Sequence, residues 1–277
     1  MAFLKLMYIT NRTDIAKLAD ECGVDRIFID LEIVGKEERQ ANMDTVISRH
    51  SIDDISKIKS VLKNAELLVR VNPIYSASER EIDECIKRGA DILMLPYFKS
   101  GDEVRKFIKF IDGRVKTCLL VETAEAVEHL DDILEIPGID MIHIGLNDLH
   151  LSYGLDFMFE LLSNGTVEKI ARKIKAKNIP YGFGGIARIG KGMLPAEHVI
   201  AEHYRLGSEM AILSRSFCNA SNCLNVREIE DIFRDGLKEI YEYQDSLKVK
   251  PCEFFEENQK KATEEIDRIV GQIKSKR

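Results

Sequence analysis

Two apolar runs near the middle of the chain each end on a carboxylate. Glu122 lies in LLVETAEAV (119–127), and Asp148 follows 26 residues later in MIHIGLNDLHLSYG (141–154). Two carboxylates without a softer ligand beside them suit a hard divalent cation, Mg²⁺ or Mn²⁺, which keeps positions open for water and substrate oxygens. Each acid could instead cap the helix that follows it or pair with a basic neighbour. The spacing alone leaves both interpretations open.

The same 26-residue interval continues toward the N-terminus. Arg70 ends the strand-like part of LLVRVNP (67–73), and Pro96 lies in DILMLPYF (91–98), so positions 70, 96, 122 and 148 are evenly spaced. This interval fits one regular strand-and-helix repeat. The carboxyl ends of parallel barrel strands converge on one face of the barrel. We therefore expect Arg70, Glu122 and Asp148 to face a common site.

Eight short runs rich in Val, Ile, Leu and aromatic residues would have to position these groups. They cover residues 4–10, 26–32, 67–73, 91–98, 117–124, 141–148, 179–186 and 209–216. Most are continuously apolar, which is typical of parallel strands covered by helices, and amphipathic stretches separate them. Eight alternations in roughly 250 residues predict an α/β fold of the (β/α)8 TIM-barrel type. A doubly wound sheet is the main rival, but MYITNRTD after the first run lacks the expected Gly-rich phosphate loop.

The region after the eighth run is longer than barrel closure requires. No Pro/Gly/Ser-rich linker interrupts the alternation, so residues 1–250 are predicted to form one barrel and 251–277 a C-terminal helical extension. Four apolar residues of this extension repeat at helical spacing: Ile266, Ile269, Val270 and Ile273. The stripe could pack on its own barrel or cover a neighbouring subunit by exchange. We expect a homo-oligomer.

Composition narrows the class of partner. The formal net charge is −7, and Lys and Arg are interspersed with Asp and Glu, so nucleic acid is not an expected partner. The six cysteines show no paired zinc spacing, which favours reduced thiols in the cytoplasm. No run of 18 apolar residues and no secretory signal pattern occurs, so neither a membrane nor an export route is expected.

Several of these segments together resemble one enzyme family. LLVRVNP, DILMLPYFKSGDEV, LLVETAEAVEHLDDILEIPGIDMIHIGLNDLHLSYG and LGSEMAILSRS are similar, in the same order, to segments of the HpcH/HpaI aldolase and citrate lyase family of (β/α)8 enzymes. The most specific element is a Glu-Thr-x-Glu-Ala strand end followed at this distance by a Gly-x-x-Asp-Leu turn. The resemblance implies a small-molecule 2-oxo acid substrate and a divalent metal cofactor.

The resemblance also implies a role for individual residues. Glu122 and Asp148 fall on the two protein metal ligands of the family, and Arg70 falls on the arginine that contacts the keto oxygen of the bound 2-oxo acid. Gly145 and Asn147 fall in the turn whose backbone N–H groups hold the substrate carboxylate. Such a site could stabilise a pyruvate-type enolate by several kcal/mol.

The sequence departs from the aldolase branch beside the second strand. That branch has Glu-His here, whereas DLEIVGKEERQ keeps Glu32 and places Ile33 in the His position, so Asp30 and Glu32 are the remaining candidates for a base relay. His50, in ISRHSIDD, could replace the missing imidazole from a loop. Leu120 replaces a glutamine, and the loop between the fourth and fifth strands is short, so the acceptor half of the substrate is not implied.

These residues predict a metal-dependent carbon–carbon lyase of the class II aldolase type, which cleaves or forms a 2-oxo acid through a pyruvate enolate. Two alternatives remain. DLE and RVNP are closer to the CoA-ester lyase branch, which favours a CoA-ester or citrate-type lyase subunit, and the missing His admits a non-catalytic 2-oxo acid binding protein.

One further stretch, YGFGGIARIGKG (181–192), follows the seventh run. Its glycines with Arg188 and Lys191 could bind phosphate, or could simply permit a tight turn.

Overall fold

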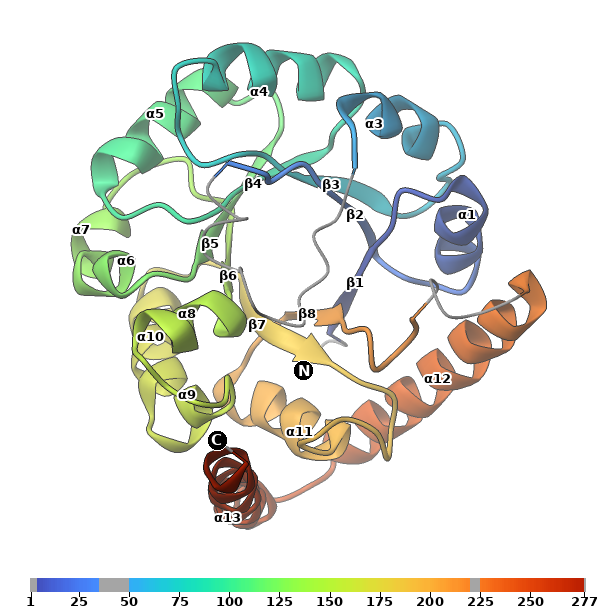
Figure 1. Ribbon diagram of the computed structural model, residues 1–277, viewed down its shortest axis with the longest axis vertical. Helices are drawn as coiled ribbons and strands as arrows, with labels where there is room; N and C mark the ends of the chain where they lie inside the picture. The colour runs from blue at the N-terminus through green and yellow to red at the C-terminus, as the bar shows by residue number, and fades with distance from the viewer. Residues whose placement is uncertain (1–3, 35–49, 220–224, 277) are drawn as a thin grey trace. The chain divides into compact units, whose positions relative to one another are not determined.

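Every apolar run predicted as a strand overlaps one in the computed structural model, which describes residues 4–34, 50–219 and 225–276. The strands are β1 Lys5–Ile9, β2 Arg26–Asp30, β3 Glu66–Arg70, β4 Ile92–Leu95, β5 Lys116–Val121, β6 Met141–Ile144, β7 Tyr181–Ile186 and β8 Met210–Leu213. They form a closed barrel in the order β1 to β8, and the pairs for which a register is defined are parallel (Figure 1). The predicted TIM-barrel fold is confirmed.

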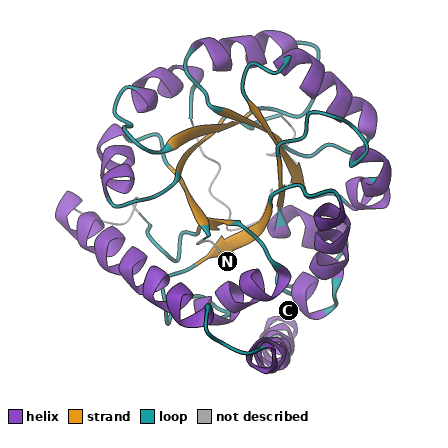
Figure 2. Cartoon of the chain, turned by 180° about the vertical axis from the view of Figure 1, so that it is seen from behind, coloured by secondary structure: helices purple, strands orange, loops and turns teal. Residues whose placement is uncertain are grey.

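The chain divides into two units, one made of Tyr8–Ile142 and the other of Met1–Met7 with His143–Arg277. In the first unit, helices lie on the outer side of strands β2 to β5 (Figures 1 and 2). They are α1 Thr13–Glu21, α3 Ile52–Lys59, α4 Ser78–Lys87, α5 Gly101–Ile111, α6 Ala124–Glu128 and α7 Leu130–Ile133. The strands are almost wholly buried, because the barrel interior covers one face and the helices cover the other. Their continuous apolar pattern follows from this double burial.

The second unit contains β7 and β8 with the remaining helices. These are α8 Leu146–Ser152, α9 Glu160–Ser163, α10 Thr166–Ala176, α11 Ala196–Leu206, α12 Val226–Leu247 and α13 Cys252–Ser275. Strand β7 is irregular, since its register against β8 shifts between Gly182 and Gly185. A β-carbon on Gly182 would lie 2.1 Å from the carbonyl oxygen of Met210, so the two strands approach too closely for any other residue.

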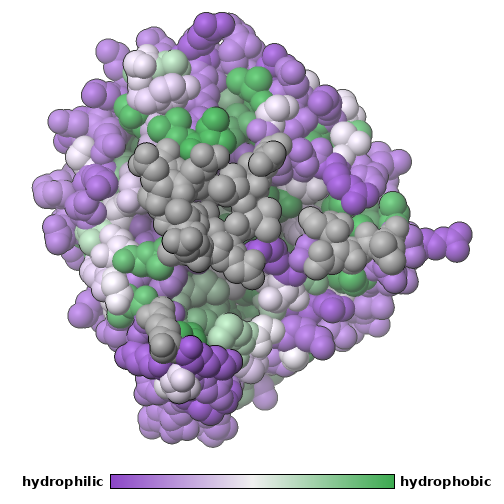
Figure 3. Space-filling model, in the orientation of Figure 1, coloured by the Kyte–Doolittle hydropathy of each residue, from purple (hydrophilic) through white to green (hydrophobic). Residues whose placement is uncertain are grey.

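The C-terminal extension is the single long helix α13, which packs on α11 and α9 of the same chain (Figure 1). Ile266 and Ile269 are fully covered, while the outward side of the helix is hydrophilic in Figure 3. A part-buried polar contact reinforces this packing, because Asn258 Oδ1 lies 2.7 Å from His198 Nδ1. Two residues of the predicted stripe, Ile266 and Ile269, are therefore buried within the chain, whereas Val270 and Ile273 are half-buried. The predicted division at residue 250, the exchange of this helix and the homo-oligomer stay predictions.

Within the described ranges, no helix combines the length and the apolar character that a membrane span requires.

Candidate active site

Arg70 ends strand β3 and is held by the neighbouring strand β2. The register pairs Asp30 with Arg70, so their side chains lie side by side at the carboxyl ends of the two strands. Arg70 Nε donates to Asp30 Oδ1 at 2.9 Å and Nη2 donates to Oδ2 at 2.8 Å, a two-pronged ion pair. Glu32 Oε2 lies 3.4 Å from Arg70 Nε. The guanidinium is thus held by the carboxylate of Asp30, the last residue of β2, and lies close to that of Glu32, which follows the strand.

The surroundings of Arg70 are strongly acidic and excluded from water. Asp30, Glu32 and Glu122 are only 2%, 1% and 2% exposed. Burial alone would lower the pKa of Arg70, but the carboxylates of Asp30, Glu32 and Glu122 outweigh it and raise this pKa above its ordinary value. The guanidinium is therefore charged at every working pH. Three buried carboxylates therefore lie near the Arg70 guanidinium.

Glu122 follows strand β5, and one of its carboxylate oxygens is bound by the turn after β4. Thr123 caps α6, since its Oγ1 accepts a hydrogen bond from Ala126 N at 3.1 Å. Glu122 Oε1 instead accepts from Tyr97 N at 2.9 Å, on the turn after β4. Tyr97 adopts the left-handed region with φ of 49°, which directs its N–H toward the carboxylate at some cost in backbone energy. The N-cap hydrogen bond of α6 is thus made by Thr123, and Glu122 Oε1 is engaged by Tyr97.

Asp148 lies in the first turn of α8, and Gly145 is the N-cap of this helix. The Asp148 carboxylate is half-buried and forms no hydrogen bond or ion pair with any residue that the structure describes. The position of α8 depends on β7: a β-carbon on Gly184 would lie 2.7 Å from Leu146 Cδ1, so the glycine makes room for the start of the helix. Asn147, also half-buried, occupies the same turn.

The structure thus gathers the predicted site residues into two groups. Arg70, Asp30, Glu32 and Glu122 come together in the unit Tyr8–Ile142, and Gly145, Asn147 and Asp148 lie together at the start of α8 in the other unit. β5 and β6, which precede Glu122 and Asp148, are neighbours in the strand order. Among the described residues, no three or more His, Cys, Asp or Glu side chains form a metal-binding group. A site made of only two carboxylates has fewer residues than such a group.

The Nδ1 atom of His50 is directed at the backbone of strand β2. This nitrogen accepts a hydrogen bond from the backbone N–H of Asp30 at 3.0 Å, so it satisfies the end of strand β2. Ile33, in the position of the family histidine, is 59% exposed.

Residues 5–179 match the family described as HpcH/HpaI aldolase/citrate lyase, a match that spans more than half of the chain and includes every predicted site residue. The chain belongs to the HpcH/HpaI aldolase/citrate lyase family. Members of this family are aldolases and lyases that act on small molecules, typically with a divalent metal.

Solved structures with a similar fold include two HpcH/HpaI family proteins and a citrate synthase. An HpcH/HpaI aldolase from Desulfitobacterium hafniense DCB-2 is 17% identical with a TM-score of 0.62, covering 87% of this chain and 93% of that one. An HpcH/HpaI aldolase/citrate lyase family protein from Burkholderia cenocepacia J2315 is 14% identical with a TM-score of 0.63, covering 82% and 95%. The citrate synthase SbnG is 16% identical with a TM-score of 0.59, covering 88% and 95%. No curated protein matches the sequence significantly.

The Gly-rich stretch 181–192 lies beyond the part that matches the HpcH/HpaI family. Arg188 packs its aliphatic part against α12, where a β-carbon on Gly236 would lie 3.3 Å from Arg188 Cγ. Its Nε atom is buried and has no hydrogen-bond partner within the described ranges, and Lys191 is exposed. Phosphate binding by this stretch stays a prediction.

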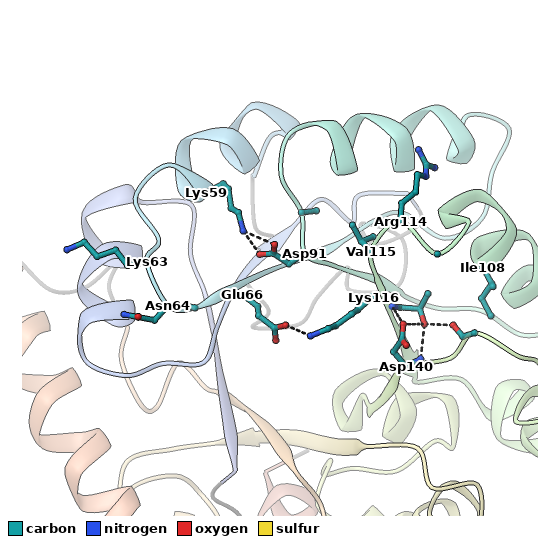
Figure 4. A pocket seen from close by; sticks show the side chains of 15 residues that line it. Lys59, Lys63, Asn64, Glu66, Asp91, Ile108, Arg114, Val115, Lys116 and Asp140 are labelled. Atoms are coloured by element: carbon teal, nitrogen blue, oxygen red, sulfur yellow. Dashed lines mark hydrogen bonds and ion pairs between the residues drawn. The ribbon is translucent and has the colours of Figure 1, made fainter.

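A cavity of about 730 Å³ opens at the amino ends of strands β3 to β6, opposite the ends that carry Arg70 and Glu122. Four of its charged side chains form two ion pairs: Lys59 Nζ lies 2.6 Å from Asp91 Oδ2, and Lys116 Nζ 2.5 Å from Glu66 Oε1 (Figure 4). Asp91 also accepts from Leu67 N at 2.7 Å. These contacts join the start of β5 to β3 and the residue before β4 to α3 and β3. In (β/α)8 enzymes such as the HpcH/HpaI family, this end of the barrel is structural.

Sequence reasoning assigned no role to Asn72 or Tyr97, although Asn72 lies in the RVNP run two residues after Arg70. That two-residue spacing from a predicted site arginine was the available signal for Asn72, because alternate residues of a strand share a face. Tyr97 acts through its backbone N–H, which no side-chain pattern can indicate.

Proposed function

We propose that this protein is a metal-dependent carbon–carbon lyase that cleaves or forms a 2-oxo acid through a pyruvate enolate. The observation that carries the proposal is the buried cluster in which Arg70 is surrounded by Asp30, Glu32 and Glu122. Membership of an aldolase and lyase family supports the reaction class.

The donor set fits a divalent cation. Glu122 is a buried carboxylate, and Asp148 is half-buried without a partner among the described residues. We propose that these two hold Mg²⁺ or Mn²⁺, both hard ions that prefer carboxylate oxygens. Bound there, the ion would supply Lewis acidity toward the keto and carboxylate oxygens of the substrate.

Arg70 stabilises the charge that develops on the substrate. Its guanidinium cannot lose its proton, and Asp30 holds it in one orientation from two atoms. Placed beside the keto oxygen, it lowers the energy of the enolate more than that of the ketone, because the enolate oxygen carries the greater negative charge. The backbone N–H groups of the turn at Gly145 and Asn147 would bind the substrate carboxylate.

In the cleavage direction, a base must remove the hydroxyl proton of the acceptor half. The carbon–carbon bond then breaks, its electron pair passes to the enolate, and the acceptor leaves as a carbonyl compound. Asp30 uses both oxygens on Arg70, whereas Glu32 makes a longer contact of 3.4 Å. We assign the base relay to Glu32 and the orientation of Arg70 to Asp30.

Two alternatives have specific support. RVNP and the DLE motif favour a CoA-ester or citrate-type lyase, and the similarity in fold to a citrate synthase is consistent with carbon–carbon bond formation. The exposed Ile33 in place of the family histidine favours a protein that binds a 2-oxo acid without turning it over.

The test is exchange of the pyruvate methyl protons in D₂O with added Mg²⁺, followed by proton NMR. The proposed lyase should exchange these protons without its acceptor, because enolate formation precedes bond formation. A protein that binds pyruvate but exchanges nothing would refute the lyase and leave the binding protein. Arg105→Ala, on the exposed surface of α5, is a matched control for Arg70→Ala.

A further inference from the structure

Two backbone N–H groups directly after Glu32 are bound by one side chain that follows strand β3. Asn72 is buried, and its Oδ1 accepts two hydrogen bonds, from Ile33 N at 2.9 Å and from Val34 N at 3.0 Å. The side chains of Ile33 and Val34 are exposed, so their packing contributes little to holding this segment. In the part of this segment that the structure describes, residues 33 and 34 are therefore held through the Asn72 amide.

Glu81 on α4 fixes the orientation of that amide. Asn72 Nδ2 donates to Glu81 Oε1 at 2.7 Å. An ionised carboxylate only accepts hydrogen bonds, so it selects the amide orientation that turns Oδ1 toward the two backbone donors. Burial raises the pKa of Glu81 above its ordinary value, while the hydrogen bond from Asn72 acts in the opposite direction.

The bonds on both sides of Glu32 define its place. Leu31 N donates to the carbonyl oxygen of Arg70 at 2.9 Å, and Glu32 N donates to Asp30 Oδ1 at 3.2 Å. With the N–H groups of Ile33 and Val34, the four consecutive backbone N–H groups of residues 31–34 are thus all hydrogen-bonded. Only the last two depend on a side chain that lies outside the Arg70 ion-pair cluster.

We propose that Asn72, oriented by Glu81, is the positioning residue that holds Glu32 beside Arg70. The proposal rests on the function proposed above, in which Glu32 relays the proton. Asn72 touches neither substrate nor metal in this account. It acts only through the backbone that carries Glu32.

A charge swap tests the pair. Asn72→Asp keeps an oxygen for Ile33 and Val34 but places a second carboxylate against Glu81 with no proton donor between them. Glu81→Gln alone retains an acceptor for Asn72 Nδ2. In the double variant, the amide introduced at position 81 can donate to the carboxylate introduced at position 72 and restore the arrangement with donor and acceptor exchanged. Asn164→Asp, on an exposed loop where Oδ1 accepts from Thr166 N, is the matched control.

Two readouts are measured on the full-length chain with Mg²⁺ and pyruvate. The first is kcat and KM for methyl proton exchange. We expect N72D to lower kcat about 10- to 100-fold with a smaller change in KM, E81Q to remain within about 5-fold, and N72D/E81Q to recover most of the loss. The second readout is hydrogen–deuterium exchange of the Ile33 and Val34 amides, which N72D should accelerate and the double variant should slow again.

The outcomes separate this proposal from the proposed function. Faster exchange of the Ile33 and Val34 amides in N72D with unchanged kcat would overturn the positioning role. A double variant whose amides are protected again but whose kcat is as low as that of N72D would also overturn it. If the unmodified protein exchanges no pyruvate protons, the lyase function fails, and the amides still decide the positioning. Protection lost in N72D and restored in the double variant would support it, whereas unchanged protection would refute it.

Discussion

Replacing Arg70 with alanine perturbs the proposed site at its centre. The substitution removes two hydrogen bonds to Asp30 and leaves Asp30, Glu32 and Glu122 buried without their guanidinium. Breaking a buried ion pair by removing one partner costs about 3–5 kcal/mol, because the remaining charge is left uncompensated. We expect the free energy of unfolding to fall by about this amount.

The effect on turnover is a separate quantity. One preorganised donor aimed at a developing oxyanion contributes about 2.7–4 kcal/mol, or about 10²–10³-fold in kcat. R70A should therefore lower kcat for pyruvate proton exchange by about that factor, with a much smaller change in KM. R70K keeps the positive charge but has no planar fork to match both oxygens of Asp30, so it should recover only part of the rate.

The assay is proton exchange by NMR at a temperature at which thermal melts show the variants folded. R105A should behave as the unmodified protein in both stability and exchange, since Arg105 pairs with Asp102 on the exposed side of α5. If R70A is destabilised but exchanges protons at the normal rate, Arg70 is only the partner of structural carboxylates. The proposed mechanism would then be wrong.

Three further predictions address the metal, the pH dependence and the assembly. Chelation should abolish pyruvate proton exchange, and added Mg²⁺ or Mn²⁺ should restore it. The variants E122Q and D148N should each lose proton exchange, whereas the control E125Q, whose glutamate pairs with the exposed Lys99, should keep it. Full proton exchange after exhaustive chelation would exclude the metal. Burial alone would raise the pKa of Asp54, but hydrogen bonds from Ser51, Lys57 and Asn11 lower it to about 2. Because the folded-state pKa is the lower one, this stabilisation of roughly 1–2 kcal/mol is present above about pH 4 and is lost as the pH falls toward 2. The stability difference between the unmodified protein and D54N should therefore shrink over that range in acid unfolding, and a constant difference would refute the assignment. Light scattering should show that the intact chain is a homo-oligomer. Truncation after Lys250 exposes the surface covered by Ile266 and Ile269, so it should shift the protein toward monomer or aggregate. A monomeric intact chain would refute the prediction.

The barrel could be predicted from sequence because its strands are buried on both faces. Ile27, Phe28 and Ile29 in β2 are at most 1% exposed. The run is therefore apolar throughout and differs from the alternating pattern of a half-exposed strand. The regular repeat also placed Arg70 at the end of a strand and Glu122 directly after one. These features follow from the periodicity of the backbone, which the sequence records directly.

The hydrogen-bond partners at the site could not be predicted in this way. Glu122 and Thr123 are adjacent, and Thr123 makes the N-cap hydrogen bond of α6. The partner of Glu122 Oε1 is Tyr97 N, which comes from a different strand end. Likewise, the partner of His50 is a backbone N–H of Asp30, 20 residues away. Such pairings depend on the relative placement of loops in three dimensions, on which local propensity and spacing carry no information.

Two of the buried acids near Arg70 are not needed to orient it. One two-pronged carboxylate can hold a guanidinium, and Asp30 supplies it. Glu32 and Glu122 are also buried near the same guanidinium, and burying a carboxylate costs free energy. In the proposed function this cost is offset by separate tasks, because Glu122 holds the divalent cation and Glu32 relays the proton.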